Sequence, residues 1–191
     1  MEVISYTHNL KIVLSQLKSS DKLGFVPTMG ALHKGHLELV KCAKLTCDKV
    51  IVSIFVNQRQ FNNSNDYSKY PRTITDDIAL LEESGVDFLF CPESPEELFP
   101  DDFKSLNVDL QDVDNQMEGE FRPGHFQGVI DVVHQFFNII NPTTAFFGLK
   151  DFQQYLIIKK MAHQCFPKLE IIGVDTCREK SGLAMSSRNT F

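Results

Sequence analysis

The sequence lacks the features that mark membrane-spanning, secreted or disulfide-stabilised proteins. No stretch approaches the roughly 20 apolar residues of a transmembrane helix. The segment Met1–Ser5 has no basic residues ahead of an apolar run, so no signal peptide is expected. The five cysteines are odd in number and include no C-x-x-C pair, which favours free thiols. We therefore expect a cytoplasmic protein that does not associate with membranes.

An excess of basic residues is also absent. The chain has 19 Lys and Arg against 25 Asp and Glu, so its formal net charge is −6. This balance argues against nucleic acid or an anionic membrane surface as a partner, while a local basic pocket can still bind a small anion. Hydrophobic residues make up 42% of the 191 positions, which is typical of a globular protein and excludes disorder. The length suits a single α/β domain.

Two kinds of apolar pattern alternate along the chain. Short apolar runs predict strands, and apolar residues at helical spacing lie between them; the runs are 23–26, 50–56, 86–91, 145–147 and 170–174. This alternation predicts the α/β class, with a Rossmann-like open parallel sheet and helices on both faces. The irregular segment 92–124 contains one further possible edge strand near Leu106–Leu110. Such sheets bind ligands at the carboxyl ends of their strands, near the point where strand order reverses.

The loop after the first predicted strand carries the strongest chemical signal, and it covers residues 27–36. Gly30 and Gly35 have the spacing of a Walker A loop, but the Lys-Ser/Thr pair that should follow is missing, which excludes a P-loop. What remains is His33-Lys34-Gly35-His36 at the mouth of a helix, where backbone N–H groups favour a phosphate. Bound phosphate would favour the charged imidazoles, which can stabilise a phosphoryl-transfer transition state.

Two other interpretations of this histidine pair stay open. His33 and His36 could bind a metal, but the pair provides too few ligands and no Cys or His cluster completes it. They could also be ordinary histidines on a surface turn. At the first strand–helix junction of a parallel sheet, phosphate binding is the interpretation we favour.

Several motifs between Gly24 and Asn189 occur in an order that resembles pantothenate synthetases (pantoate–β-alanine ligases). They are Pro27-Thr28-Met29-Gly30, His33-Lys34-Gly35-His36, Ser53-Ile54-Phe55-Val56-Asn57, Tyr70-Pro71-Arg72-Thr73, Arg122-Pro123-Gly124-His125-Phe126, Lys150-Asp151-Phe152-Gln153-Gln154 and Ser186-Ser187-Arg188-Asn189. The resemblance implies a fold of the nucleotidylyltransferase type with its H-x-G-H signature. It also implies condensation of pantoate with β-alanine through a pantoyl adenylate, with ATP consumed, Mg²⁺ assisting and a homodimer as the assembly.

The resemblance assigns the phosphates of ATP to residues from three parts of the chain. It implies His33, His36, Lys150 and Arg188 as catalytic groups. Its full set of implied ATP contacts is Met29, Gly30, His33, Gly35, His36, Gly148, Lys150, Asp151, Cys177, Met185, Ser186, Ser187 and Arg188. Lys150 can bind phosphate as a point charge, and Asp151 stands at a helix start that it could cap. The stretch 185–188 resembles the mobile loop that clamps the triphosphate in this superfamily.

The hydroxy acid is assigned to a second group of residues. The resemblance implies that Gln60 and Gln154 hold pantoate, and we add Asn57 and Arg122 as substrate-binding candidates. A glutamine amide can donate and accept hydrogen bonds, which suits a hydroxyl and a carboxylate, and Arg122 can reach an anion. The family usually has Pro-Met where this chain has Gln58-Arg59.

The metal and the domain boundary complete these expectations. The resemblance implies Asp77 near Mg²⁺, while an acid in the first turn of a helix also simply suits the helix dipole. Family members continue into a small C-terminal lid, so residues 1–191 are expected to form the N-terminal nucleotide- and pantoate-binding domain with weak or absent turnover. The alternatives are another H-x-G-H nucleotidylyltransferase with a phosphate acceptor, or a non-catalytic nucleotide-binding module.

Overall fold

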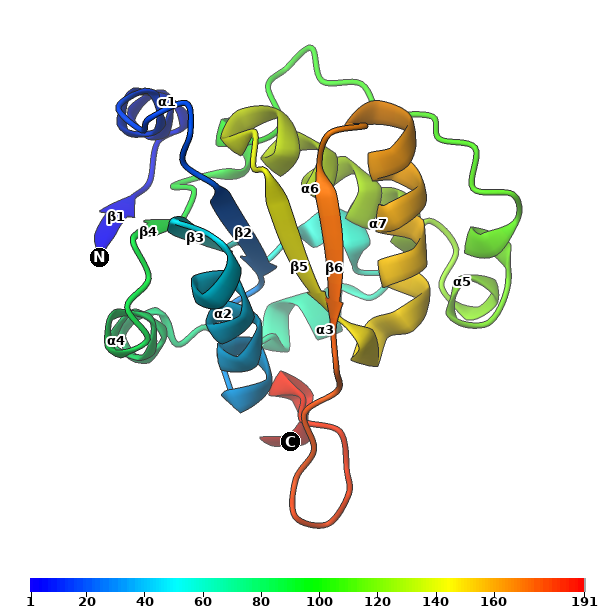
Figure 1. The fold of residues 1–191 in the computed structure, drawn as a ribbon. Helices are drawn as coiled ribbons and strands as arrows, with labels where there is room; N and C mark the ends of the chain where they lie inside the picture. The colour runs from blue at the N-terminus through cyan, green and yellow to red at the C-terminus, as the bar shows by residue number, and fades with distance from the viewer. Residues whose placement is uncertain (191) are drawn as a thin grey trace.

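A computed structural model, which describes residues 1–190, contains one open sheet of six parallel strands (Figure 1). The strands lie in the spatial order β1-β4-β3-β2-β5-β6. Their bounds are β1 (Glu2–Ile4), β2 (Leu23–Thr28), β3 (Lys49–Ile54), β4 (Phe88–Phe90), β5 (Thr144–Gly148) and β6 (Glu170–Val174). The predicted open parallel sheet is therefore confirmed, and the short edge strand β1 is an addition that the sequence pattern did not indicate.

Helices cover both faces of the sheet, as predicted. They are α1 (Thr7–Ser15), α2 (Lys34–Thr46), α3 (Ser64–Lys69), α4 (Ile74–Glu83), α5 (Glu118–Phe121), α6 (His125–Ile140) and α7 (Phe152–Cys165). One buried cluster joins α1, α6 and α7 to the sheet, and a second joins α2 and α4 to the opposite face. Among residues 1–190, no helix has the length and apolar character needed to cross a bilayer.

The central position of β3 follows from its side chains. Val50, Ile51 and Val52 are all fully buried, with Val50 and Val52 on one face and Ile51 on the other. A strand that is apolar on both faces is stable only between two helical layers, because one face would otherwise contact water. Helix α6 is buried over most of its surface as well, because it contacts both α1 and α7 within the cluster that covers one face of the sheet.

The order of the strands reverses between β2 and β5. From β2 the chain runs outward through β3 and β4, and it then returns to place β5 and β6 on the other side. β2 and β5 pair only at Gly24 and Phe25, so the two strands separate toward their carboxyl ends. Pro27 has no N–H group, and it fits within β2 because its nitrogen faces this gap, where no strand needs a donor. On the other side of β2, Thr28 O accepts a hydrogen bond from Phe55 N, which follows β3. This separation forms the crevice expected at a topological switch point.

The predicted edge strand at Leu106–Leu110 is wrong. The residues are extended but pair with no strand within residues 1–190, and Asp109 forms hydrogen bonds with the Gln164 side chain of α7 instead. Gln164 Oε1 accepts from Asp109 N at 3.3 Å, and Gln164 Nε2 donates to Asp109 O at 2.9 Å. A side-chain amide has thus replaced the neighbouring strand that the backbone would otherwise need.

Candidate functional site

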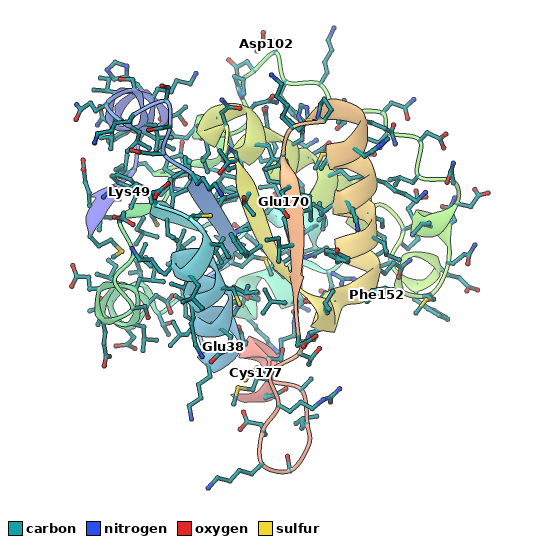
Figure 2. All side chains as sticks on the ribbon, in the orientation of Figure 1. Glu38, Lys49, Asp102, Phe152, Glu170 and Cys177 are labelled. Atoms are coloured by element: carbon teal, nitrogen blue, oxygen red, sulfur yellow. The ribbon has the colours of Figure 1, made fainter. Side chains whose placement is uncertain are left out.

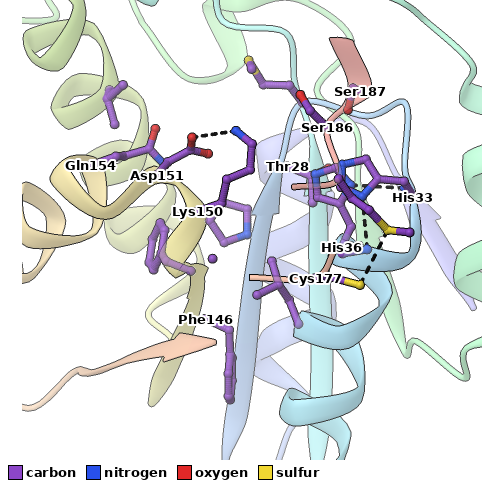
Figure 3. Close-up of a pocket in the computed structure, with 18 of the residues that line it drawn as sticks. Thr28, His33, His36, Phe146, Lys150, Asp151, Gln154, Cys177, Ser186 and Ser187 are labelled. Carbon is purple, nitrogen blue, oxygen red and sulfur yellow. Dashed lines mark hydrogen bonds and ion pairs between the residues drawn. The ribbon is translucent and has the colours of Figure 1, made fainter. Parts of the chain in front are cut away.

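A pocket opens at the carboxyl ends of β2 and β5, where most of the predicted site residues meet (Figure 3). The predicted residues that line it are Met29, His33, Gly35, His36, Gln60, Gly148, Lys150, Asp151, Gln154, Cys177, Met185, Ser186, Ser187 and Arg188. The other four, Gly30, Asn57, Asp77 and Arg122, lie outside this lining. Figure 2 shows Cys177 just beyond the lower ends of the strands, on the same edge.

The loop between β2 and α2 is held from behind by Asp77. This carboxylate is 2% exposed, and it accepts hydrogen bonds from Ala31 N at 2.9 Å and from Leu32 N at 2.7 Å. Gly30 and Ala31 both have positive φ, at 78° and 49°. A Cβ on Gly30 would lie 3.0 Å from Asp77 Oδ2, so glycine suits both the turn and the close approach. Asp77 therefore holds the turn that leads into the histidine motif.

His33 and His36 form a reciprocal cap at the start of α2. His33 Nδ1 accepts from Gly35 N at 3.1 Å, and His36 Nδ1 accepts from His33 N at 3.3 Å. The two rings are 4.1 Å apart between centroids. Because each Nδ1 is an acceptor, the remaining proton of each neutral ring lies on Nε2. Gly35 is required between them, since a Cβ there would lie 2.9 Å from the His33 ring.

Both imidazoles are neutral at pH 7 in this pocket. Burial, assisted by the neighbouring His33 and Lys150, lowers the pKa of His36 to about 3. Burial and Lys150 lower the pKa of His33 as well, while Glu179 acts in the opposite direction. We expected bound phosphate to favour the charged imidazoles. Burial opposes that protonation. As neutral rings, the two histidines offer N–H donors to an anion.

Lys150 and Asp151 follow β5 in a short 3₁₀ turn, η4 (Leu149–Asp151). Lys150 Nζ contacts Asp151 Oδ1 at 2.9 Å, and both side chains are partly exposed. Asp151 precedes α7, but its side chain makes no capping hydrogen bond, so the predicted cap is wrong. The carboxylate pairs with the adjacent ammonium group instead. Figure 3 shows the Lys150 ammonium group beside the Asp151 carboxylate, across the pocket from the histidine pair.

The segment 177–190 folds back over the same edge of the sheet. Met185 N donates to Cys177 O at 2.9 Å, and the two sulfur atoms lie 3.6 Å apart. Ser187 Oγ donates to Ala31 O at 3.0 Å, which attaches this segment to the first loop. Arg188 pairs with Asp66 of α3 at 3.0 Å and lies over the ring of Tyr70. The predicted clamp residues thus reach the pocket, and of their partners Asp66 is exposed while Tyr70 is buried.

Gln60 lies in the 3₁₀ turn η1 (Gln58–Gln60), and its amide is oriented by a buried neighbour. Asn57 is 1% exposed, and its Nδ2 donates to Gly128 O at 2.9 Å and to Gln60 Oε1 at 3.1 Å. The Gln60 Nε2 group is therefore the end that faces the pocket, where it lies 3.2 Å from Met29 Sδ. Arg122 Nη2 donates to Gln60 O, so Arg122 and Asn57 both support Gln60 from behind.

The part of the pocket beside Gln60 is apolar. Its lining includes Phe55 and, from α6, Val129, Val132, Val133 and Phe136. The helical spacing of these four α6 residues predicts only an amphipathic helix, because residues that face a pocket and residues that face a sheet follow one helical period. Only the position of α6 over the crevice distinguishes the two roles.

Tyr70 is a second lining residue that sequence analysis did not select. It is 6% exposed, and burial raises the pKa of its phenol. Its ring contacts Phe61 edge to face at 5.8 Å between centroids. The signal available was its place at the start of the motif Tyr70-Pro71-Arg72-Thr73.

The described residues do not form a protein-made metal site. No group of three His, Cys, Asp or Glu side chains between residues 1 and 190 could hold an ion. Both carboxylate oxygens of Asp77 are already hydrogen-bonded to backbone N–H groups, and this residue lies outside the pocket lining. The interpretation of His33 and His36 as a metal pair lacks the further ligands it needs.

Comparison with known proteins gives one consistent result. The family model described as Pantoate-beta-alanine ligase matches residues 2–191. Pantothenate synthetase of Bartonella henselae is 50% identical over 88% of this chain and 59% of its own length. That of Carboxydothermus hydrogenoformans is 50% identical over 95% of this chain and 64% of its own length. The chain thus spans about three fifths of these relatives.

Solved structures agree with the sequence relatives. The crystal structure of pantothenate synthetase from Thermus thermophilus matches all of this chain and 67% of its own, with 43% identity and a TM-score of 0.92. Pantoate-beta-alanine ligase from Francisella tularensis, complexed with beta-gamma ATP and beta-alanine, matches all of this chain and 72% of its own, with 42% identity and a TM-score of 0.95. On these matches, the chain belongs to the pantoate-beta-alanine ligase family.

Proposed function

We propose that this chain carries out the ATP-dependent condensation of pantoate with β-alanine to pantothenate, through a pantoyl adenylate and with release of AMP and pyrophosphate. The observation that carries the proposal is the meeting of two unlike surfaces in one crevice. A polar surface contains the histidine pair, Lys150 and Arg188, and the adjoining apolar surface contains Gln60 and the valines of α6. Such a crevice can hold a nucleoside triphosphate beside a small branched hydroxy acid.

The polar surface suits the α-phosphate and the leaving pyrophosphate. His33 and His36 offer Nε2–H donors, and Lys150 provides a positive charge from the opposite side of the crevice. Ser186 and Ser187 add hydroxyl groups from the last segment. Donors placed before the reaction stabilise the charge that develops on phosphoryl oxygens without reorganising at that moment. ATP would bring Mg²⁺ through its own phosphates, because the described residues form no separate site for it.

The apolar surface suits pantoate. Its two methyl groups would contact the valines of α6, and its hydroxyl and carboxylate would face Gln60 and Gln154. Gln60 presents Nε2, a donor, because Asn57 already occupies Oε1. A carboxylate held there could attack the α-phosphate of ATP, and the amine of β-alanine would then displace AMP. No enzyme nucleophile is needed, since the substrates supply both, and positioning is the main task of the protein.

A pyrophosphate-release assay tests this proposal. The chain is incubated with ATP, Mg²⁺ and pantoate, with and without β-alanine. We expect weak, pantoate-dependent pyrophosphate release, with AMP and pantothenate formed only when β-alanine is present. Transfer of the nucleotide to a phosphate-bearing acceptor would favour another H-x-G-H nucleotidylyltransferase. ATP binding without any pyrophosphate would favour a non-catalytic module.

We also propose a homodimer that resides in the cytoplasm. The dimer is supported by three large apolar side chains that remain exposed near the start of α7: Met117 (73%), Phe121 (79%) and Phe152 (55%). The start of α7 is joined to the segment that carries Met117, because Gln153 donates to Gln116 O and accepts from Glu118 N. An exposed apolar group of this kind is typical of a protein interface. The cytoplasm is supported by five free cysteines.

A further inference from the structure

Arg59 and Asp131 form an ion pair directly behind the turn that carries Gln60. Asp131 lies on α6 and is 2% exposed. Arg59 donates to Asp131 Oδ2 from Nε at 3.3 Å and from Nη2 at 3.2 Å. Ser105 Oγ donates to the same oxygen at 2.8 Å, and Gln127 Nε2 donates to the other oxygen at 2.8 Å. The buried carboxylate therefore has donors from three separate segments.

The guanidinium group of Arg59 is fixed by two rings as well. Its Cζ lies 5.0 Å from the ring centroid of Phe99 and 5.1 Å from that of Phe103. Both rings belong to the irregular segment 92–124, as does Ser105. Stacking on aromatic faces and pairing with a carboxylate are interactions that arginine makes better than lysine. A methionine at this position could not pair with the carboxylate.

Helix α6 contacts this turn at three positions, each three residues apart. His125 Nδ1 donates to Gln60 O at 2.7 Å. Gly128 O accepts a hydrogen bond from Asn57 Nδ2. A Cβ on Gly128 would lie 2.4 Å from Arg59 O, so only glycine allows the helix and the turn to come this close. Asp131 then binds the Arg59 side chain. The backbone on both sides of Gln60 is thus attached to the helix that lines the hydroxy-acid surface.

We propose that Arg59 and Asp131 are positioning residues for Gln60, and that they set the affinity of the pocket for the hydroxy acid. The inference rests on the proposed function. The ion pair attaches η1 to α6 at Asp131, one helical turn after the Asn57 contact at Gly128. This second attachment sets the distance between the Gln60 amide and the valines of α6. Because Asp131 is buried, its charge stays compensated only while Arg59 remains in this place. ATP contacts none of these groups in the proposed arrangement.

Calorimetric titration of the chain with pantoate, and separately with ATP, tests the proposal. The variants are Arg59→Met, Arg59→Lys and Asp131→Asn, each checked for folding by its thermal midpoint. We expect Arg59→Met to weaken pantoate binding about tenfold, with Arg59→Lys intermediate, because displacement of a positioned group costs affinity steeply. Asp131→Asn should also weaken pantoate binding. The double variant should bind pantoate about as weakly as Arg59→Met alone, since the two residues act as one unit. ATP affinity should stay within about twofold.

Lys49→Met is the matched control. Lys49 pairs with Asp87 at 3.0 Å at the amino end of β3, the edge of the sheet opposite the pocket (Figure 2). This variant should leave both affinities unchanged. Unchanged pantoate affinity in folded Arg59→Met, or an equal fall in pantoate and ATP affinity, would overturn the inference. If Arg59→Met does not fold, Arg59→Lys and Asp131→Asn decide in the same way. Failure of the unaltered chain to bind pantoate would overturn the proposed function and this inference together.

Discussion

Two segments bring to the pocket the groups that we propose to bind phosphate, and the structure holds these segments in different ways. The first loop, residues 29–36, is supported by the buried carboxylate of Asp77 and by the reciprocal histidine cap. The last segment, residues 184–190, is attached by one part-buried hydrogen bond, from Ser187 Oγ to Ala31 O, and at the surface by the pair between Arg188 and Asp66. In that pair both side chains are more than 40% exposed.

This difference determines which segment can move. Exposed ion pairs exchange with water at little cost, and the median exposed pair contributes about 0–1 kcal/mol. A buried backbone N–H that loses its acceptor costs about 1–3 kcal/mol. The first loop is therefore pre-organised, while the last segment can rearrange when a nucleotide enters. Pre-organised donors belong where charge develops, and an adjustable segment suits the entry and release of ligands.

His36→Ala should have the largest effect, because it removes a donor from the pre-organised loop. We expect pyrophosphate formation to slow about a hundredfold, which corresponds to roughly 3 kcal/mol of transition-state stabilisation. The free energy of unfolding should also fall, by about 1–3 kcal/mol, because His33 N loses its acceptor. Stopped-flow or quench measurement of pyrophosphate release in the presence of pantoate gives the rate.

His8→Ala provides the control for that variant. His8 is exposed on α1 and lines no part of the pocket. An unchanged rate in His36→Ala would remove His36 from the catalytic groups.

Asp77→Ala tests the support of the first loop. The N–H groups of Ala31 and Leu32 would lose their acceptor, so we expect the free energy of unfolding to fall by about 2–4 kcal/mol. ATP binding should weaken as well, because the turn ahead of the histidines is released. Urea denaturation and ATP titration measure the two effects. Asp76→Ala, at the exposed neighbouring position, should change neither. Wild-type stability in Asp77→Ala would show that the loop does not depend on this carboxylate.

The proximity of the residues proposed to bind phosphate could be predicted from the sequence, because they lie within short contiguous motifs. Gly30, His33, Gly35 and His36 share one strand–helix junction, so their proximity needs no knowledge of the tertiary fold. The support by Asp77 could not be predicted in this way, since it joins positions 46 residues apart. Its place in the first turn of α4 suggested only a favourable contact with the helix dipole.

Competition from side-chain partners explains the wrong predictions. Asp151 stands where a capping residue would, but the adjacent ammonium group of Lys150 attracts its carboxylate. The extended segment at Leu106–Leu110 looks like an edge strand, yet the Gln164 side chain provides the hydrogen bonds at Asp109. In each case a side chain replaced the backbone partner that the local pattern predicted.

A third prediction concerns the pH dependence of the first loop. Burial holds the pKa of His36 at about 3, well below the ordinary value of 6.5. The unfolded chain therefore binds a proton between these pH values that the folded chain does not, and stability falls as the pH decreases from about 7 toward 3. His36→Gln keeps a hydrogen-bonding side chain without this titration. We expect the unaltered chain to lose more stability between pH 8 and pH 5.5 than the variant does, measured by urea denaturation. Equal losses would contradict a buried, neutral His36.

Asp66→Ala should have the smallest effect, because it releases the last segment rather than the first. The pair with Arg188 is exposed, so we expect the free energy of unfolding to change by less than about 1 kcal/mol. ATP affinity should stay the same or rise by about twofold, since Arg188 no longer has a competing carboxylate. Glu38→Ala breaks an exposed pair with Lys41, away from the pocket lining, and should leave ATP affinity unchanged. A stability loss as large as that of Asp77→Ala would mean that both segments are held rigidly, and the contrast between them would not stand.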